Sequence, residues 1–257
     1  MIVAVTGKAK PSLSSRSISA RRKTGPIVDK FLSIQTEPAV SQQPNIPVIP
    51  KVAGLILAGG KGQRMGGNKP FRKLAGRPLI AHVINAASRQ CDHLMISSNE
   101  DVSLFAEFSL LVVVDKPEPG QGPLGGVLGG LSALPALPDG VDWLATFPVD
   151  CPIVPDDMVG RLIGAAIDAG KPAAFASHVG RDHFLSAVWH RDAAEIIAGQ
   201  LASDDRRVGG ALRAVGAVGV DFPVGAGQAA PFTNINTPDD LTAVEAVLAS
   251  LIGLADR

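Results

Sequence analysis

Three basic side chains stand in a glycine-rich segment that follows a short apolar run. Residues 57 to 69 read Leu-Ala-Gly-Gly-Lys-Gly-Gln-Arg-Met-Gly-Gly-Asn-Lys, so Lys61, Arg64 and Lys69 stand among five glycines. Glycine lets the backbone come close to a ligand, and backbone N–H groups together with cationic side chains bind phosphate. The pattern predicts a phosphate-binding loop, with a purely structural turn as the alternative.

The spacing of the glycines excludes two common phosphate-binding motifs. A dinucleotide-binding G-x-G-x-x-G would need a glycine where Met65 stands. A P-loop would need Lys followed by Ser or Thr where Asn68 and Lys69 stand. The segment therefore indicates neither a nicotinamide-dependent dehydrogenase nor a P-loop nucleotide hydrolase.

Two aspartates each follow an apolar run. Asp150 stands between two prolines after the run 143–147, and Asp115 follows the run 110–114. A hard cation that bridges phosphates takes one or two carboxylates and several waters, so Asp150 is a candidate Mg²⁺ ligand. Capping of the next helix is the alternative for Asp150. For Asp115, nucleotide recognition, a second metal contact and a solvated turn stay open.

Two asparagines stand near the C-terminus, in the segment Pro-Phe-Thr-Asn-Ile-Asn-Thr-Pro. Asn234 and Asn236 are two residues apart and share one face of an extended run. Their amides could bind a ligand or cap the last helix, and on residue chemistry alone we expect capping. Further upstream, the glycines of Gly122–Gly126 permit close backbone approach at the start of a helix.

Apolar runs alternate with helical patterns from Lys51 onward, which is typical of a mainly parallel sheet with helices on both faces. We therefore predict a three-layer α/β/α domain over residues 51–257. Ligands of such sheets bind beyond the carboxyl ends of the strands. The expected strands are Val52–Ala58, His93–Ser98, Leu110–Val114, Trp143–Pro148, Ala173–Ser177, Leu185–Trp189 and Ala217–Phe222; the expected helices are Pro78–Arg89, Val102–Phe108, Leu124–Leu134, Pro155–Ala169, Asp192–Leu201, Asp205–Ala214 and Thr237–Leu251.

Composition limits the kinds of partner. The 257 residues include 24 Lys and Arg against 24 Asp and Glu, so no net charge attracts nucleic acid or an anionic membrane. No apolar run is long enough to span a bilayer, which needs about 18 residues. The two cysteines, Cys91 and Cys151, have no metal-binding spacing and suit a reducing compartment, so we expect a cytoplasmic protein.

The first 50 residues differ from the rest. They hold seven Lys and Arg against two acids, and six prolines, with no lasting hydrophobic period. An Arg- and Ser-rich start with few acids is similar in composition to a transit peptide, and a proline-spaced stretch is typical of a linker. We predict a disordered extension over residues 1–50, or an overlong start, before the domain.

Taken together, these motifs resemble the molybdenum cofactor guanylyltransferases, a family of Rossmann-like, glycosyltransferase-A-like nucleotidyltransferases. The matching pieces occur in family order from residue 52 to about residue 250. Leu-Ala-Gly-Gly, in place of the Leu-Ala-Ala-Gly of cytidylyl and uridylyl relatives, favours guanine. The pieces are Leu57–Gly60, Arg64–Gly67, Lys69, Leu74, Gly76–Leu79, Asp115, Gly122–Leu124, Gly126, Pro148–Pro152, Arg181–His183, Arg206–Val208 and Asn234–Leu241.

The resemblance implies that the terminal phosphate of molybdopterin, or of its molybdenum-loaded form, attacks the α-phosphate of GTP and that pyrophosphate leaves. Mg²⁺ is the implied cofactor, and a molybdenum-insertion enzyme or molybdoenzyme chaperone is a further implied partner. No side-chain nucleophile is needed, because positioning and charge neutralisation dominate phosphoryl transfer. The implied residues are Lys69, Arg64 and Asp150 for catalysis, Asp150 for the metal, Leu57, Ala58, Gly59, Gly60, Lys69, Ser97, Asp115 and Asp150 for the nucleotide, and Asn234, Asn236, Arg206 and Arg207 for the acceptor.

Three positions depart from the family pattern. Asn68 stands where the family has Asp, Ser97 where it has Asn, and Phe184 where it has Pro. Asn68 and Ser97 motivate a second hypothesis, a catalytically weak nucleotide-binding relative that acts by protein interaction, whereas Lys69 and Asp150 oppose it. Two enzymatic hypotheses also stay open: a cytidylyltransferase acting on the same pterin, and a different nucleotidyltransferase, such as one acting on sugar 1-phosphates.

Overall fold

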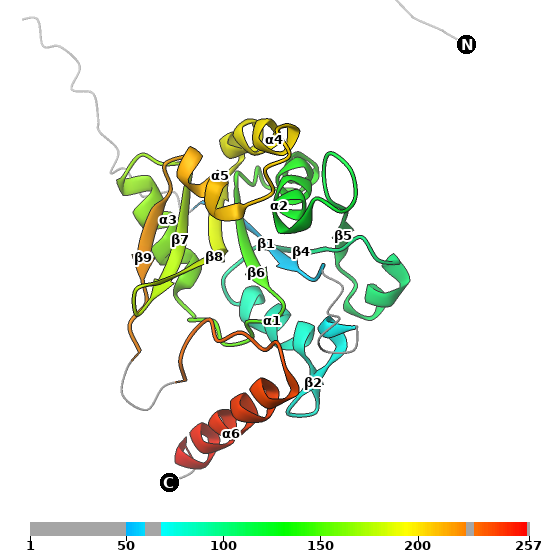
Figure 1. Ribbon diagram of the computed structural model, residues 1–257, viewed down its shortest axis with the longest axis vertical. Helices are drawn as coiled ribbons and strands as arrows, with labels where there is room; N and C mark the ends of the chain where they lie inside the picture. Colours follow the sequence, from blue (N-terminus) through cyan, green and yellow to red (C-terminus); the bar gives the residue numbers. More distant parts are fainter. Residues whose placement is uncertain (1–49, 60–67, 225–228, 256–257) are drawn as a thin grey trace, which may run out of the picture. The chain divides into compact units, whose positions relative to one another are not determined.

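The computed structural model describes residues 50–59, 68–224 and 229–255 (Figure 1). Two predicted site residues, Gly60 and Arg64, lie outside the described residues, as does the N-terminal segment up to residue 49. The roles of these two residues and the domain boundary near residue 50 therefore stay predictions.

Seven strands form one mixed sheet in the order β5-β4-β1-β6-β8-β7-β9 (Figure 1). All pair in parallel except β8, which runs antiparallel to both of its neighbours, β6 and β7. The mainly parallel sheet predicted from the alternating pattern is thus confirmed. The strands are β1 (Val52–Leu57), β4 (His93–Ser97), β5 (Leu111–Val113), β6 (Trp143–Pro148), β7 (Ala173–His178), β8 (Arg181–His190) and β9 (Val218–Asp221).

β8 begins four residues earlier than predicted. A tight turn pairs His178 with Arg181, and the strand then continues through Phe184. Because Arg181–His183 is polar, this half of the strand has no apolar pattern that would mark it. Phe184 stands where the family pattern has a proline. Its ring packs edge-on against the ring of Phe175, with the ring centroids 5.2 Å apart. The departure at Phe184 therefore belongs to strand packing, not to a turn.

Helices cover both faces of the sheet, and β1 shows why. Strand alternation sends Val52 and Ile56 into one apolar cluster and Ala53 and Leu55 into the other, and all four are buried. Helices α1 and α3 pack on the first cluster, and α2, α4 and α5 on the second (Figure 1). The three-layer prediction is confirmed. The helices are α1 (Leu79–Ser88), α2 (Gly122–Ala133), α3 (Met158–Asp168), α4 (Ala194–Ala202) and α5 (Val208–Ala214), while the predicted helix Val102–Phe108 is the 3₁₀ helix η3.

A third, smaller apolar cluster joins the C-terminal helix to a short hairpin. The hairpin consists of β2 (Lys73–Leu74) and β3 (Arg77–Pro78), and the helix is α6 (Pro238–Ala255). Leu74 and Val244 are buried together in this cluster. No helix that the structure describes is long and apolar enough to cross a membrane. The cluster fixes the position of the chain just before α6, where the two asparagines stand.

Candidate active site

Four strand ends meet at one edge of the sheet and carry predicted site residues. Leu57 ends β1, Ser97 ends β4, Asp115 follows β5 and Asp150 follows β6. Backbone pairing continues past the strands, since the N–H of Ala58 donates to the carbonyl of Ser97 at 3.0 Å. The strands β5, β4, β1 and β6 are neighbours in the sheet, so along its carboxyl edge the residues lie in the order Asp115, Ser97, Leu57 and Asp150.

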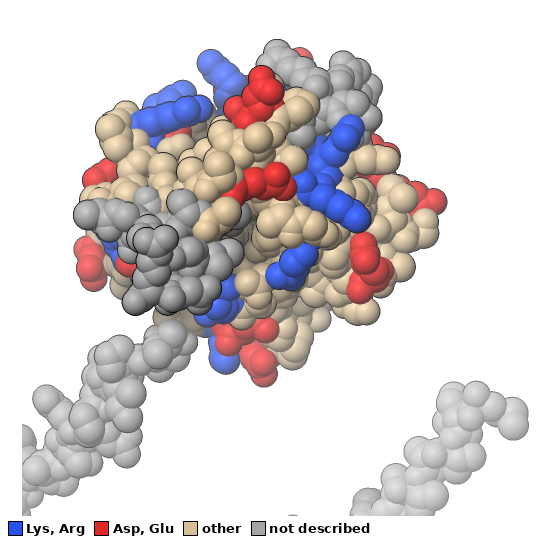
Figure 2. Space-filling view, turned by 90° about the horizontal axis from the view of Figure 1, so that it is seen from below, with Lys and Arg blue, Asp and Glu red and all other residues tan. Residues whose placement is uncertain are grey.

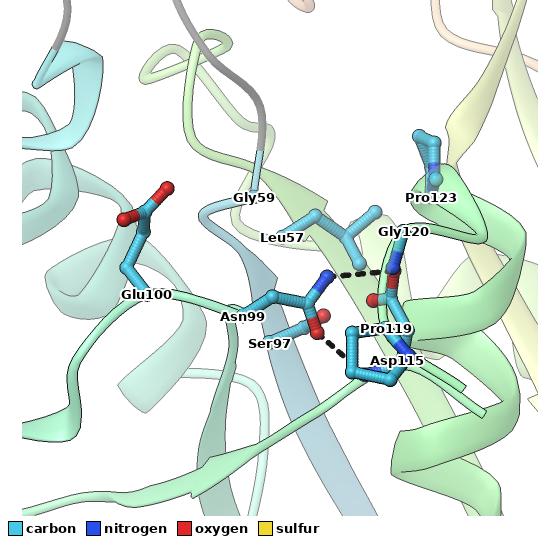
Figure 3. A pocket seen from close by; sticks show the side chains of 10 residues that line it. Leu57, Gly59, Ser97, Asn99, Glu100, Asp115, Pro119, Gly120 and Pro123 are labelled. Atoms are coloured by element: carbon cyan, nitrogen blue, oxygen red, sulfur yellow. Dashed lines mark hydrogen bonds between the residues drawn. The ribbon is translucent and has the colours of Figure 1, made fainter. Parts of the chain in front are cut away.

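A cavity of about 470 Å³, named here the Asp115 cavity, opens at the ends of β1 and β4 and at the turn that follows β5 (Figure 3). It brings together Leu57, Gly59, Ser97 and Asp115, four of the residues predicted to contact the nucleotide. Ala58, a fifth, is buried and does not line it. A cavity of this volume is large enough for a nucleoside. It is lined by Leu57, Gly59, Ser97, Asn99, Glu100, Asp115, Pro119, Gly120, Gly122 and Pro123.

Asn99 and Asp115 hydrogen-bond to each other at the wall of this cavity (Figure 3). The Nδ2 of Asn99 donates to Asp115 Oδ2 at 2.8 Å, and the N–H of Asp115 donates to Asn99 Oδ1 at 3.0 Å. The N–H of Gly120 also donates to Asp115 Oδ2, at 3.2 Å. Asp115 is only 5% exposed, and these bonds hold its carboxylate in one orientation. Asn99 is absent from the predicted site residues, although it stands two residues after a strand end.

Glycines of α2 allow the helix to lie directly against these strand ends. A Cβ on Gly126 would come within 2.3 Å of Ser97 Oγ, and one on Gly129 within 2.2 Å of the carbonyl oxygen of Val114. A side chain at either position would push the helix away. The close approach predicted for the glycines around residue 126 is therefore a helix–strand contact, and it helps to bury Ser97.

Lys69 links the middle of the site to the C-terminal segment. Its Nζ lies 2.9 Å from Asp150 Oδ2 and 2.7 Å from Asn236 Oδ1. The side chains of Lys69 and Asp150 are 15% and 24% exposed, so the pair is largely withdrawn from solvent. Lys69 begins the 3₁₀ helix η2 (Lys69–Phe71), and Asn68 before it has a φ of 52°. Asparagine takes this left-handed conformation more readily than most residues, which accounts for its place there.

The alternative that Asp150 caps a helix is wrong. Helix α3 begins at Met158, and Asp157 occupies the position before it. The Asp150 carboxylate instead faces Lys69. Its placement two residues after β6 leaves it at the sheet edge, where the sequence predicted a functional carboxylate.

The expectation that the two asparagines cap α6 is also wrong. Thr237 caps the helix: its Oγ1 accepts from the N–H of Asp240 at 3.1 Å. In return, Asp240 Oδ2 accepts from the N–H groups of Asn236 and Thr237, each at 2.9 Å. These backbone bonds lower the pKa of Asp240. The side chain of Asn236 is thereby left to reach Lys69.

The side chain of Asn234 is held by a thiol. Cys151 is buried, and burial together with the adjacent Asp150 carboxylate raises the pKa of its thiol, which therefore keeps its proton. The Sγ donates to Oδ1 of Asn234. This bond leaves the Nδ2 donors of Asn234 available to a ligand. Cys91 and Cys151 are both unpaired.

Two adjoining hollows of about 530 and 220 Å³ lie on the β8 side of Asp150, and we name them together the His183 cleft. Arg181, His183 and Asn234 line both hollows. Asp150 borders the smaller one and Asn236 the larger. The two asparagines predicted for the acceptor therefore share a cleft with a polar strand start that the apolar pattern did not reveal.

The two predicted acceptor arginines lie elsewhere. Arg206 donates from Nη1 to the carbonyl of Gly120 at 3.2 Å, so it contacts the loop that lines the Asp115 cavity. It also pairs with Asp204 at 3.0 Å. Arg207 makes two bonds of 2.8 Å to Asp205 and lowers the pKa of that carboxyl to about 2. The structure does not bring these arginines together with the asparagines, and their role in acceptor binding stays a prediction.

Charge on the underside of the molecule is mixed. Figure 2, seen from below, shows basic and acidic side chains interspersed. This pattern agrees with the equal totals of the two signs along the chain. Attraction for an anionic ligand must therefore come from particular side chains such as Lys69 and not from a broad field.

Comparison with known proteins decides the family. Residues 54–218 match the model of the MobA-like NTP transferase domain. A molybdenum cofactor guanylyltransferase of Rhodopseudomonas palustris (strain BisB5) is 38% identical over 200 residues, which are 77% of this chain and 94% of that protein. The chain belongs to the molybdenum cofactor guanylyltransferase family. Another guanylyltransferase, from Cereibacter sphaeroides, is 41% identical over 77% of this chain and 97% of its own length.

Solved structures support the fold of this guanylyltransferase family member. Molybdopterin-guanine dinucleotide biosynthesis protein A from Archaeoglobus fulgidus superposes with a TM-score of 0.63 at 22% identity, covering 77% of this chain and 99% of its own. A CMP:2-keto-3-deoxy-manno-octonic acid synthetase in complex with CTP superposes with a TM-score of 0.59 at 13% identity, covering 78% and 99%. The fold is thus shared with a molybdopterin-guanine dinucleotide biosynthesis protein and with a synthetase that binds CTP.

Proposed function

We propose that the protein transfers GMP from GTP to the phosphate of molybdopterin, or of its molybdenum-loaded form, and releases pyrophosphate. The observation that carries this proposal is the position of the Lys69–Asp150 pair, which lies between the Asp115 cavity and the His183 cleft. Transfer between two substrates needs two binding regions with the reacting phosphates between them. Family membership supports GTP and molybdopterin as the two substrates.

The Asp115 cavity would hold the nucleoside of GTP. Leu57 and Ser97 line it, and Asp115 with Asn99 presents fixed hydrogen-bonding groups. The triphosphate would extend past the end of β1 toward Lys69. An ammonium group there stabilises the charge that builds up on the departing pyrophosphate.

Asp150 fits the role of a magnesium ligand. Mg²⁺ is commonly held by one or two carboxylates together with substrate phosphates, so a single protein carboxylate is enough. Among the described residues no cluster of three or more His, Cys, Asp or Glu is suited to a metal. When bound, the ion would supply charge neutralisation at the phosphates. Lys69 contacts Oδ2 of Asp150, so its ammonium would move from this oxygen to the phosphates when substrates bind.

The reaction needs no protein base. An oxygen of the acceptor phosphate would attack the α-phosphorus of GTP, forming a new P–O bond. The bond from that phosphorus to the oxygen bridging to the β-phosphate would break, and its electron pair would leave with pyrophosphate. Since a phosphate monoester has a second pKa of about 6, the nucleophile is already mostly deprotonated at neutral pH. The protein's own part is therefore positioning and charge compensation. Two unpaired thiols suit a reducing compartment, so we place this reaction in the cytoplasm.

A product assay tests the proposal. The protein would be incubated with molybdopterin, GTP and Mg²⁺, with molybdopterin guanine dinucleotide and pyrophosphate as the expected products. If GTP gives no dinucleotide while CTP gives the cytosine product, the protein is a cytidylyltransferase and not a guanylyltransferase. Thermal shift with GTP, CTP and UTP in the presence of Mg²⁺ provides the matching binding test, with the largest shift expected for GTP.

The hypothesis of a catalytically weak nucleotide-binding relative loses part of its motivation. Asn68 suits the left-handed backbone that precedes Lys69. Beside Ser97, the carboxamide of Asn99 lies in the same cavity and supplies the kind of group that Ser97 lacks. Lys69 and Asp150 remain paired at the centre of the site. These features support an active enzyme.

A further inference from the structure

Arg181 stands at the start of β8 with its charge available. Because β8 runs antiparallel to β6, its first residues reach the same sheet edge as Asp150. Arg181 is exposed and lines both hollows of the His183 cleft. It forms no ion pair with any residue that the structure describes, whereas Arg206 and Arg207 each pair with an aspartate. An unpaired guanidinium beside a substrate cleft is suited to a phosphate, which it can bind through two parallel hydrogen bonds.

His183 lies next to Arg181 in the cleft and is held in place by aromatic packing. Its ring packs on Phe232 with centroids 5.0 Å apart, and Phe232 is itself 1% exposed. Burial, followed by the charge of Arg181, lowers the pKa of His183, so the imidazole is mostly neutral at pH 7. A neutral imidazole still offers one N–H donor.

Asn234 completes a set of donors around the smaller hollow. Its oxygen is taken by the Cys151 thiol, which directs the available hydrogen-bonding capacity of the amide to its Nδ2. Asp150 borders the same hollow, so a phosphate held there lies beside the proposed magnesium ligand. A dianionic nucleophile approaching a triphosphate is repelled, and a cation on the acceptor side reduces that repulsion.

We propose that Arg181, with His183 and Asn234, binds the terminal phosphate of the acceptor and positions it for attack. The inference rests on the proposed function and assigns the acceptor phosphate to the start of β8 instead of to Arg206 and Arg207. The pterin part of the acceptor then occupies the larger hollow, which is lined by Phe232 and Asn236.

A ligand pair tests the phosphate contact directly. Anaerobic binding of molybdopterin and of its dephosphorylated form would be measured by fluorescence or calorimetry. The wild type is expected to prefer the phosphorylated ligand by about ten-fold or more, since hydrogen bonds to charged groups contribute about 1.5–3 kcal/mol. In Arg181→Ala this ratio should fall toward one, while the Kd for GTP stays unchanged. His183→Gln should reduce the ratio less.

The other end of the same strand provides the control. Arg191 follows β8 at the opposite edge of the sheet and pairs with Asp142 at 3.0 Å, so Arg191→Ala should keep the wild-type ratio. An unchanged ratio in Arg181→Ala overturns the inference. Arg181→Gln, which keeps a polar side chain but removes the charge, replaces it if the alanine variant fails to bind GTP. If the wild type yields no dinucleotide, the proposed function fails, and the ratio still reports whether Arg181 binds phosphate.

Discussion

The Asp115 cavity and the His183 cleft lie on either side of Asp150 and are built in different ways. All residues that line the cavity fall between positions 57 and 123, at parallel strand ends and at the start of a glycine-rich helix. The cleft combines the start of an antiparallel strand with segments near residues 150 and 230–240. The cavity is therefore built from residues close in sequence whose backbones pack together. The cleft is built from segments distant in sequence that contact one another through side chains.

This difference predicts how each region responds to change. In the cavity, helix and strand backbones touch, so an added methyl group disturbs packing before it disturbs chemistry. In the cleft, side chains are held by side-chain contacts such as that of Cys151 with Asn234, so a side-chain change should alter substrate binding with little effect on the fold. Four predictions test this contrast.

Replacing Asp150, which lies between the two regions and borders the His183 cleft, should have the largest effect. We expect Asp150→Ala to lower the rate of pyrophosphate release by about 100-fold or more, since the proposed metal contact and the charge partner of Lys69 would both be lost. Asp156→Ala is the matched control, because Asp156 is exposed and pairs only with Arg89 in the described structure. A wild-type rate in Asp150→Ala would refute the metal role and remove the common centre of the two regions.

Two glycine variants test the packing of the cavity. Gly129→Ala should destabilise the protein by about 1–3 kcal/mol, as overpacking against the carbonyl of Val114 forces α2 outward. Gly164→Ala in α3, where an added Cβ meets nothing within 4 Å, should stabilise it by about 0.4–1 kcal/mol. Chemical denaturation measures both. Equal effects of the two variants would mean that α2 does not depend on close contact.

A pair of asparagine variants separates the two regions by substrate. Asn99→Ala removes two hydrogen bonds to Asp115 and should raise the KM for GTP by about ten-fold, with the acceptor KM nearly unchanged. Asn234→Ala should instead raise the KM for the acceptor and leave the KM for GTP nearly unchanged. Steady-state kinetics with each substrate varied in turn checks the pair. If both variants raise the same KM, the two regions do not serve separate substrates.

Asn68 should give the smallest effect. Asn68→Asp keeps a residue type that tolerates a φ of 52°, so we expect activity equal to the wild type or slightly higher. Asn68→Val, with a β-branched side chain in the same conformation, should cost about 1–3 kcal/mol of stability. Activity assays test the prediction for Asn68→Asp, and denaturation curves test the prediction for Asn68→Val. A large loss of activity in Asn68→Asp would mean that the loop binds phosphate differently from the family pattern.

The same contrast explains what the sequence could predict. The parallel strands carry continuous apolar runs because both of their faces are buried, and β6 has the bounds that its pattern indicated, Trp143–Pro148. Residues that follow such strands were therefore placed at the right edge. Lys69 and Asp150 were each predicted as site residues from this rule together with family resemblance, but the ion pair between them was not predicted.

What escaped prediction lacks a local signal. The start of β8 is polar, and its antiparallel direction depends on a hairpin whose pairing is set by long-range contacts. The partner of Lys69 at residue 236 is 167 positions away, so no short motif could reveal it. Asn99 stood at a recognisable place, but a polar residue after a strand is equally typical of a turn.

The bond between Lys69 and Asn236 has a consequence for synthesis of the chain on the ribosome. Every residue that lines the Asp115 cavity has been made once position 123 is reached, but Asn236 and the Asp240 that fixes its backbone come more than one hundred residues later. A nascent or truncated chain that ends before residue 230 therefore carries the cavity residues without the contact of Asn236 with Lys69. We therefore expect transferase activity only from a nearly full-length chain, in which α6 has docked and Asn236 contacts Lys69.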